Sequence, residues 1–197
     1  MADSFSPAAR RAVFLDRDGV INADSAAYIK GWREFHFLPG SREAIVRLCR
    51  AGLKVVVVTN QSGVARGFIS LSDLRDMHRR MAAAVRRAGG EIHGVYFCPH
   101  HPDDGCDCRK PLPGLVERAV AEHGIDPAAS CLVGDSERDV RCGRAAGVGK
   151  RILVRTGNGR AHAPRLLGDG GPEGGLLQHV ADDLAGAADW ILAGNVS

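Results

Sequence analysis

"AVFLDRDGVIN", residues 12–22, joins a short apolar run directly to two aspartates that stand two residues apart. The apolar run predicts a buried strand. Asp16 and Asp18 come at its end, and Gly19 lets the backbone turn sharply behind them. Ligands of open α/β folds gather beyond the carboxyl ends of the parallel strands. The stretch therefore predicts a fold class and the position of a site within it.

The same alternation of apolar run and helical pattern continues along the chain. The β-branched run "LKVVVVTN" (53–60) has no polar alternation, which is typical of a strand buried on both faces. We expect strands over 11–16, 53–60, 92–98, 130–135 and 150–157, and helices over 39–52, 71–88, 112–124 and 137–147. This order predicts an α/β fold with a doubly wound, mostly parallel sheet and helices on both faces. "GDGGPEGG" (168–175) predicts a loop, and "ADWIL" (188–192) a last short strand.

Length and composition describe an ordinary globular chain. At 197 residues, 45% hydrophobic and 25% charged, it predicts a single domain over residues 1–197. Net charge is only +3, aromatic content is 5%, and the arginine pairs of 78–90 fit the solvent face of a helix, so we expect no nucleic-acid partner. No apolar run approaches the roughly 20 residues of a membrane span, and the first residues lack a signal-peptide pattern. We expect a cytoplasmic monomer with reduced thiols and no membrane partner.

Reactive side chains follow four successive predicted strands, and together they are the groups that phosphoryl transfer requires. Asp16 can attack phosphorus, and Asp18 can protonate the departing oxygen and later deprotonate water. Thr59 and Lys110 can stabilise the transferring phosphoryl oxygens, and Asp135 can hold Mg²⁺ beside Asp16. A single D-x-D pair also suits a helix cap or a solvated loop. Four suitable groups at four strand ends favour a phosphatase site.

"LDRDGVIN", "VVTNQSG", "CRKP" and "VGDSERD" resemble, in this order, the four motifs of the haloacid dehalogenase-superfamily phosphatases. The resemblance covers about residues 12–157. Within the superfamily, the motifs are similar to those of the small subgroup that contains heptose 1,7-bisphosphate 7-phosphatases and histidinol-phosphatases. It implies that Asp16 is the nucleophile and Asp18 the acid/base, with Thr59 and Lys110 on the phosphoryl group. It also implies that Mg²⁺ is held by the Asp16 side chain, the Asp18 backbone carbonyl and Asp135. Asp139 would stand behind these ligands or serve only as a charge at a helix N-terminus.

"CPHHPDDGCDCRKP" (98–111) places three cysteines and two histidines in one short loop. Cys98, His100, Cys106 and Cys108 match the donors of a closed, four-coordinate Zn²⁺ site, although their spacing is tighter than common zinc motifs. A loop of free thiols and a His101 ligand are the alternatives that composition leaves open. The resemblance points to His100, to a structural zinc loop over 98–110 and to a fold without a large cap domain. Such a crosslink would fix Arg109 and Lys110, which follow the last cysteine.

The resemblance implies a small phosphorylated metabolite as substrate. "TNQSGVARG" and "LVRTG" are similar to the heptose bisphosphatases, whereas the short gap between His100 and Cys106 is closer to the histidinol-phosphatases. We expect hydrolysis of the 7-phosphate of a heptose 1,7-bisphosphate for nucleotide-activated heptose synthesis, with histidinol phosphate or another small sugar phosphate as alternatives. Arg109, with Arg66 as a weaker candidate, suits the second phosphate, while Asn22, Asp24 and Tyr28 could bond sugar hydroxyls. The full set of expected substrate-binding residues is Arg17, Asp24, Tyr28, Asn60, Gln61, Ser62 and Arg109.

Overall fold

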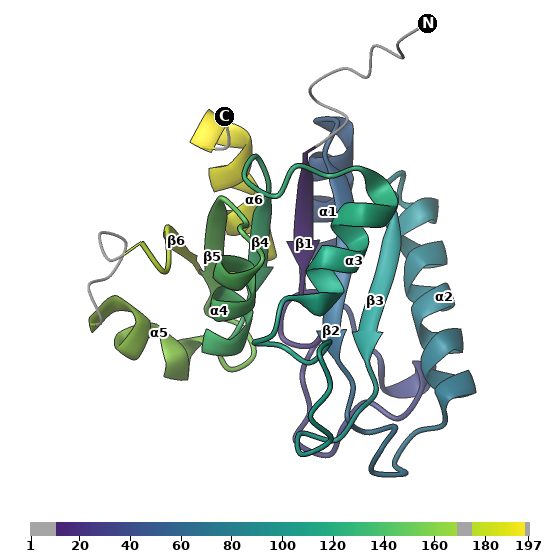
Figure 1. The fold of residues 1–197 in the computed structure, drawn as a ribbon. Coiled ribbons are helices and arrows are strands. Elements are labelled where there is room, and N and C mark those ends of the chain that lie inside the picture. The colour runs from purple at the N-terminus through teal and green to yellow at the C-terminus, as the bar shows by residue number, and fades with distance from the viewer. Residues whose placement is uncertain (1–10, 169–174, 196–197) are drawn as a thin grey trace, which may run out of the picture.

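The computed structural model of the chain describes residues 11–168 and 175–195 and contains one parallel sheet (Figure 1). Its strands are β1 (Ala12–Leu15), β2 (Lys54–Asn60), β3 (Gly94–Cys98), β4 (Cys131–Gly134), β5 (Lys150–Val154) and β6 (His179–Ala181). Their order in the sheet is β3-β2-β1-β4-β5-β6, and every adjacent pair is parallel. The doubly wound α/β fold predicted from the sequence is confirmed.

Helices cover both faces of this sheet. They are α1 (Ser41–Arg50), α2 (Leu71–Arg87), α3 (Gly114–His123), α4 (Glu137–Ala145), α5 (Gly159–Gly168) and α6 (Leu184–Trp190), with short turns of helix at Trp32–Glu34 and Ile191–Asn195. Alternate residues of β1 point to opposite faces: Leu15 packs in the core with α1, α2 and α6, and Phe14 packs with α3 and α4. None of the helices in the described ranges is long and apolar enough to cross a membrane.

The C-terminal region differs from the sequence-based expectation. Residues 188–192 were expected to form a strand, but they lie in α6 and the turn of helix that follows it. Leu184, Ala187, Ala188 and Ile191 recur at helical spacing and are buried, so a helix hides all four. Asp183 caps this helix by accepting a hydrogen bond from the Gly186 N–H at 2.9 Å. The sixth strand is His179–Ala181, and most of the expected 168–175 loop lies outside the described residues.

The parallel arrangement brings the carboxyl ends of β1, β2 and β4 together at one edge. β1 lies between β2 and β4, with Leu15 opposite Val57 and Val133. The residues that follow these strands, with those after β3 and β5, therefore share one end of the sheet. Gly19 takes a left-handed conformation (φ 80°) and turns the chain immediately after Asp18.

Candidate active site

A cavity of about 380 Å³ lies at the carboxyl end of the sheet. Its lining comes from five strand ends, so residues far apart in the sequence face one another. The lining residues are Asp16, Asp18, Asp24, Ser25, Tyr28, Ile29, Thr59, Asn60, Ser62, Arg66, Pro102, Arg109, Lys110, Asp135, Ser136, Arg138, Asp139 and Asn158.

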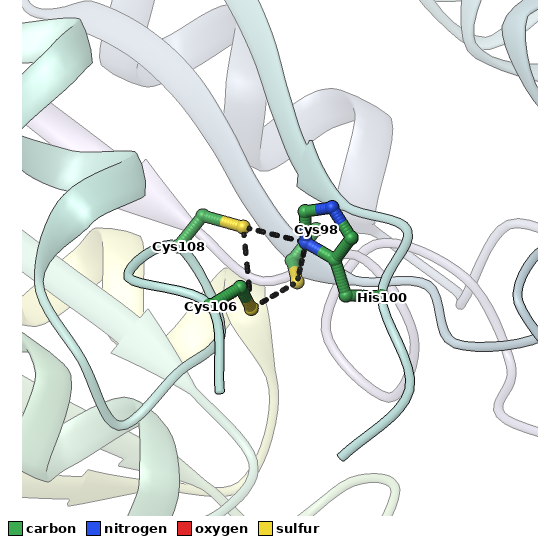
Figure 2. A group of neighbouring side chains, drawn as sticks. All are labelled: Cys98, His100, Cys106 and Cys108. Carbon is green, nitrogen blue, oxygen red and sulfur yellow. Dashed lines mark hydrogen bonds between the residues drawn. The ribbon is translucent and has the colours of Figure 1, made fainter. Parts of the chain in front are cut away.

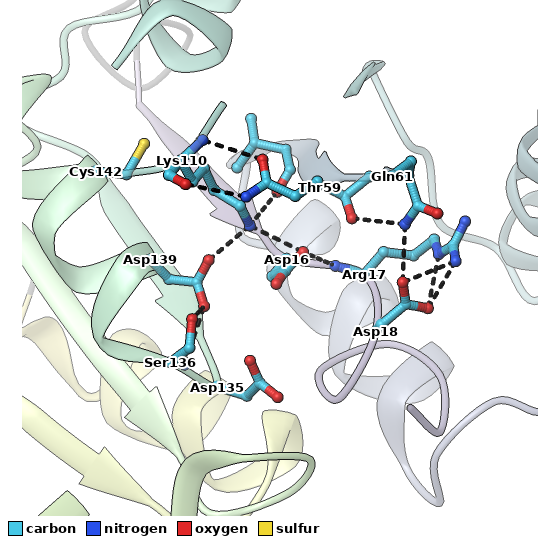
Figure 3. A network of polar contacts seen from close by, with 12 residues as sticks. Asp16, Arg17, Asp18, Thr59, Gln61, Lys110, Asp135, Ser136, Asp139 and Cys142 are labelled. Atoms are coloured by element: carbon cyan, nitrogen blue, oxygen red, sulfur yellow. Dashed lines mark hydrogen bonds and ion pairs between the residues drawn. The ribbon is translucent and has the colours of Figure 1, made fainter. Parts of the chain in front are cut away.

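Lys110 is a buried cation between two carboxylates (Figure 3). Its Nζ lies 3.0 Å from Asp16 Oδ1 and 2.6 Å from Asp139 Oδ1, and it donates to the Val58 carbonyl oxygen at 2.8 Å. Burial alone would lower the pKa of Lys110, but the carboxylates of Asp139 and Asp16 raise it above its ordinary value. Lys110 therefore stays charged, and its three contacts fix the position of Nζ. Both properties suit a group that neutralises phosphoryl oxygens.

Asp16 and Asp135 are crowded by other negative charges. Burial, and then the carboxylates of Asp139, Asp135 and Asp18, raise the pKa of Asp16 to about 7 although Lys110 opposes the change. Burial and Asp139 likewise raise the pKa of Asp135 to about 6. Carboxylates held together in this way are stabilised by a cation placed between them.

The oxygen atoms of this group fit a hard divalent cation. One carboxylate oxygen from each of Asp16, Asp135 and Asp139 lies within 4.8 Å of the others, and carboxylate oxygens are the ligands that Mg²⁺ prefers. Asp139 is already satisfied, because Oδ1 binds Lys110 and Oδ2 accepts from the N–H and the hydroxyl of Ser136 at 3.0 and 2.6 Å. The hydrogen bonds leave Asp16 and Asp135 as the two carboxylates with an oxygen to offer.

Asp18 is held by three side chains that the sequence had suggested as substrate-binding residues. Arg17 donates from Nε and Nη2 to Asp18 Oδ1 at 3.0 and 2.7 Å, and Nη2 also reaches Oδ2 at 2.8 Å (Figure 3). Asn22 Nδ2 and Gln61 Nε2 each add a bond of 2.8 Å. Burial opposes ionisation, but the Arg17 charge and these donors lower the pKa of Asp18.

These contacts direct the side chains of Arg17, Gln61 and Asn22 to Asp18, whereas the sequence had suggested that they bind the substrate. The Arg17 side chain is fully buried and also contacts His78 Nε2 at 3.1 Å through Nη1, so it cannot reach a substrate. Asn22 and Gln61 are buried with their amides on Asp18, and none of the three lines the cavity. All three donate hydrogen bonds to the Asp18 carboxylate. The sequence shows that a polar residue lies beside a motif, but it does not show whether the side chain points into the protein or into the cavity.

The other predicted residues lie on the cavity wall. Thr59 is buried, and its Oγ1 accepts a hydrogen bond from Gln61 Nε2 at 3.0 Å. Asn60 binds the backbone of Lys110 through both ends of its amide, at 3.0 and 3.1 Å, and so joins the end of β2 to the cysteine loop. The remaining predicted residues on this wall are Asp24, Tyr28, Ser62 and Arg109, together with Arg66. Within the described residues, Arg109 Nη1 is buried without a hydrogen-bond partner.

Sequence reasoning missed Arg138, His78 and Asn158. Arg138 stands in the first turn of α4 next to Ser136, inside a motif that had been read for its aspartates alone. His78 lies on α2 and reaches Arg17 from a distant part of the chain. Asn158 follows "LVRTG", and its place directly after the fifth strand was the available signal.

Cys98, His100, Cys106 and Cys108 form a compact cluster at the end of β3 and in the loop that follows it (Figure 2). Cys106 Sγ lies 3.5 Å from Cys98 Sγ and 3.6 Å from Cys108 Sγ, and His100 Nδ1 lies 3.2 Å from Cys108 Sγ. Tetrahedral Zn²⁺ with bonds of about 2.3 Å would separate two sulfurs by about 3.8 Å, so the cluster has the size and donors of a zinc site. His101 lies outside it, with Nδ1 3.2 Å from Asp103.

Known proteins resemble this chain over nearly its whole length. A family model described as HAD-hydrolase-like matches residues 107–187. A D-glycero-beta-D-manno-heptose-1,7-bisphosphate 7-phosphatase of Pseudomonas aeruginosa is 46% identical over 93% of this chain and 98% of that protein, and one of Pseudomonas putida is 48% identical over 90% and 97%. The crystal structure of a D,D-heptose 1,7-bisphosphate phosphatase from B. bronchiseptica, complexed with magnesium and phosphate, covers 93% of this chain and 99% of its own at 43% identity and a TM-score of 0.85.

Proposed function

The chain belongs to the haloacid dehalogenase-like phosphatases, and on this basis we propose that it hydrolyses the 7-phosphate of D-glycero-D-manno-heptose 1,7-bisphosphate. The product would be heptose 1-phosphate, which serves nucleotide-activated heptose synthesis. The observation that carries the proposal is the convergence of Asp16, Asp18 and Lys110 on one cavity, in a chain so similar to phosphatases of that substrate.

The first half of the reaction transfers the phosphoryl group to the protein. A carboxylate oxygen of Asp16 attacks phosphorus while the bond between phosphorus and the sugar oxygen breaks, which gives an aspartyl-phosphate. Asp18, in its protonated form, donates a proton to the departing sugar oxygen. Lys110 and the Thr59 hydroxyl stabilise the negative charge on the transferring oxygens.

The second half regenerates the carboxylate. Asp18, now ionised, accepts a proton from a water molecule that attacks the phosphorus of the aspartyl-phosphate. The bond between phosphorus and Asp16 breaks, and inorganic phosphate leaves. Asp16, Asp135 and the Asp18 backbone carbonyl would hold Mg²⁺, which when bound supplies positive charge for the phosphate.

The cavity also has groups that suit the rest of a sugar bisphosphate. Arg66, Arg109 and Arg138 line it, and none of them forms an ion pair with another described residue. A guanidinium binds a phosphate through two parallel hydrogen bonds, so these arginines suit the second phosphate. Asp24 and Tyr28 provide groups for sugar hydroxyls.

The cysteine cluster would contribute order rather than chemistry. Zn²⁺ bound by Cys98, His100, Cys106 and Cys108 closes the coordination shell and leaves no open position for a substrate. Cys108 is followed directly by Arg109 and Lys110, so fixing the loop fixes both cations over the cavity.

Phosphate release from both anomers of heptose 1,7-bisphosphate, histidinol phosphate and simple sugar phosphates tests the proposal in one side-by-side assay with Mg²⁺. We expect the highest kcat/KM with a heptose bisphosphate and no turnover by Asp16→Asn, which should remain folded by circular dichroism. A higher kcat/KM with histidinol phosphate would overturn the substrate and leave the mechanism intact. Turnover retained in D16N would remove Asp16 as nucleophile.

A further inference from the structure

The turn that follows β5 holds one particular oxygen of Asp135. The Asn158 backbone N–H donates to Asp135 Oδ2 at 2.8 Å, and the side-chain Nδ2 of Asn158 approaches the same oxygen at 3.1 Å. Among the described residues, no hydrogen bond or ion pair reaches the other oxygen, Oδ1. The two oxygens of this carboxylate therefore have different surroundings.

The turn is packed tightly around Oδ2. Thr156 Oγ1 donates to the Gly19 carbonyl oxygen at 2.6 Å, which joins the turn to the loop after β1. A Cβ atom on Gly157 would lie 2.2 Å from Asp135 Oδ2 and 2.6 Å from the Gly19 Cα. Only a glycine fits at position 157, because any side chain would clash with Oδ2 or with the Gly19 backbone. The absence of a side chain lets the backbone of the turn pack directly against the carboxylate.

The Asn158 amide also reaches Asp24, which lies in the loop after β1 and lines the cavity. Its Nδ2 lies 3.1 Å from Asp24 Oδ2, while Asp24 Oδ1 accepts from the Ser25 N–H at 2.7 Å. One amide group thus connects Asp135 and Asp24, and Asp24 fixes the orientation in which the amide faces Asp135.

We propose that Asn158 is a positioning residue that keeps Asp135 a one-oxygen ligand and so makes the cation site selective for Mg²⁺ over Ca²⁺. The inference rests on the proposed function, because it takes Asp135 as a metal ligand. Mg²⁺ demands near-ideal octahedral geometry, whereas Ca²⁺ accepts six to eight oxygens and often both oxygens of one carboxylate. With Oδ2 occupied by two N–H groups, Asp135 offers a single oxygen. Removal of the side-chain amide takes away one of these two donors and leaves Oδ2 with only the backbone N–H, so Oδ2 gains a lone pair for a second metal bond that only the larger cation can use well.

The test is the ratio of Mg²⁺ to Ca²⁺ affinity, measured by calorimetric titration of each cation into the full-length, metal-stripped and zinc-reloaded protein. Asn158→Ala removes the side chain and keeps the backbone N–H. Partners that orient a metal ligand typically contribute about 10- to 100-fold to affinity, so we expect Mg²⁺ binding to weaken about tenfold and Ca²⁺ binding to weaken less or to strengthen. The ratio of the two affinities should therefore fall. Ca²⁺ should also inhibit phosphate release by N158A at lower concentration than by the wild type.

Thr156→Val is the matched control. It removes the hydrogen bond to Gly19 from the same turn and leaves both Asp135 contacts, so it should lower stability without changing the affinity ratio. An unchanged ratio in N158A, or an equal fall in T156V, would overturn the positioning role. A wild-type protein that binds no Mg²⁺ would instead overturn the proposed metal site, so the two failures are distinct.

Discussion

Asp18 shows how neighbouring side chains determine the role of an aspartate. Four donor atoms from Arg17, Asn22 and Gln61 surround its carboxylate and favour the ionised form. Asp16, two residues earlier, has a pKa raised by burial and by adjacent carboxylates. The difference favours the ionised form of Asp18, which is the form that would take a proton from water in the second half of the proposed reaction.

In the proposed mechanism, Asp18→Asn removes the proton that the departing sugar oxygen requires. We expect kcat to fall about 10²- to 10⁴-fold, the usual contribution of general acid–base catalysis. The loss in kcat/KM, which reports the step in which the leaving group departs and not the later attack of water, should be smaller with a substrate whose leaving group needs no proton, such as 4-nitrophenyl phosphate. Steady-state assays with both substrates measure this difference, and equal losses with the two would argue against Asp18 as the acid.

Position 19 requires glycine for two reasons: its backbone is left-handed, and a side chain there would clash with Asp135. Its φ is 80°, and a Cβ atom would lie 2.3 Å from Asp135 Oδ2. Gly19→Ala should therefore displace Asp135 and weaken Mg²⁺ binding about tenfold or more. Gly52→Ala is the control, because Gly52 has φ 81° with no atom within 4 Å of the added Cβ. Both variants bear the left-handed penalty of about 1–2 kcal/mol; calorimetric titration with Mg²⁺ should detect a change in G19A alone, and an equal change in G52A would contradict the clash.

Among the structural elements, the cysteine loop (98–110) buries little apolar surface and therefore needs another source of order. Residues 98–110 contain no helix or strand after Cys98, and only Cys98, Cys108 and Lys110 among them are buried. Lys110 comes at the end of this loop and is nevertheless buried between Asp16 and Asp139. A metal crosslink between Cys98 and Cys108 would explain how a loop without helix or strand holds the buried Lys110 in place.

Cys106→Ser should remove one zinc ligand and with it most of the bound zinc. We expect the zinc content of the purified protein to fall, and Tm to fall by about 4–8 °C for a loss of about 2 kcal/mol. Cys49→Ser is the control, because the Cys49 thiol lies outside the cluster and bonds the backbone of Glu91. Elemental analysis and thermal unfolding measure both effects. A C106S protein with wild-type zinc content and Tm would overturn the zinc site.

The C-terminal elements show what a local pattern cannot decide. "ADWIL" is too short to distinguish a strand from a helix by periodicity, and its helical partners, Leu184 and Ala187, lie before it. Asp183 with its bond to the Gly186 N–H is the start signal that would have identified α6. The first five strands were predictable because each is an uninterrupted apolar run followed by polar residues.

At the scale of the whole molecule, strand order converts sequence motifs into a site. The rule that ligands lie beyond parallel strand ends was enough to predict that Asp16, Thr59, Lys110 and Asp135 share a cavity, and all four line it. The same rule could not assign Arg17 or Gln61, because it locates a residue at an edge and leaves the direction of its side chain open. His78 was beyond such reasoning, since it joins the network from the middle of α2.

His78 links the acid/base network to the pH dependence of global stability. It is 5% exposed, and its Nε2 lies 3.1 Å from Arg17 Nη1, which can only donate, so the imidazole is neutral in the folded protein. Burial, then the Arg17 charge, lower the pKa of His78 to about 3, with Asp18 opposing them. Between this value and the ordinary pKa of about 6.5 the unfolded chain binds the extra proton, so His78 lowers the free energy of unfolding as pH falls through that window.

His78→Gln keeps a polar side chain beside Arg17 and removes this titration. Between pH 7.5 and pH 5 the wild type should lose about 2 kcal/mol more unfolding free energy than H78Q, as measured by urea denaturation at each pH. His36→Gln, a change at an exposed histidine, should retain the wild-type slope. If H78Q and H36Q lose the same free energy over this range, the imidazole of His78 is not a buried neutral acceptor of the Arg17 hydrogen bond in the folded protein. If H78Q alone has the shallower slope, acid unfolding and the support of Asp18 depend on the same buried side chain.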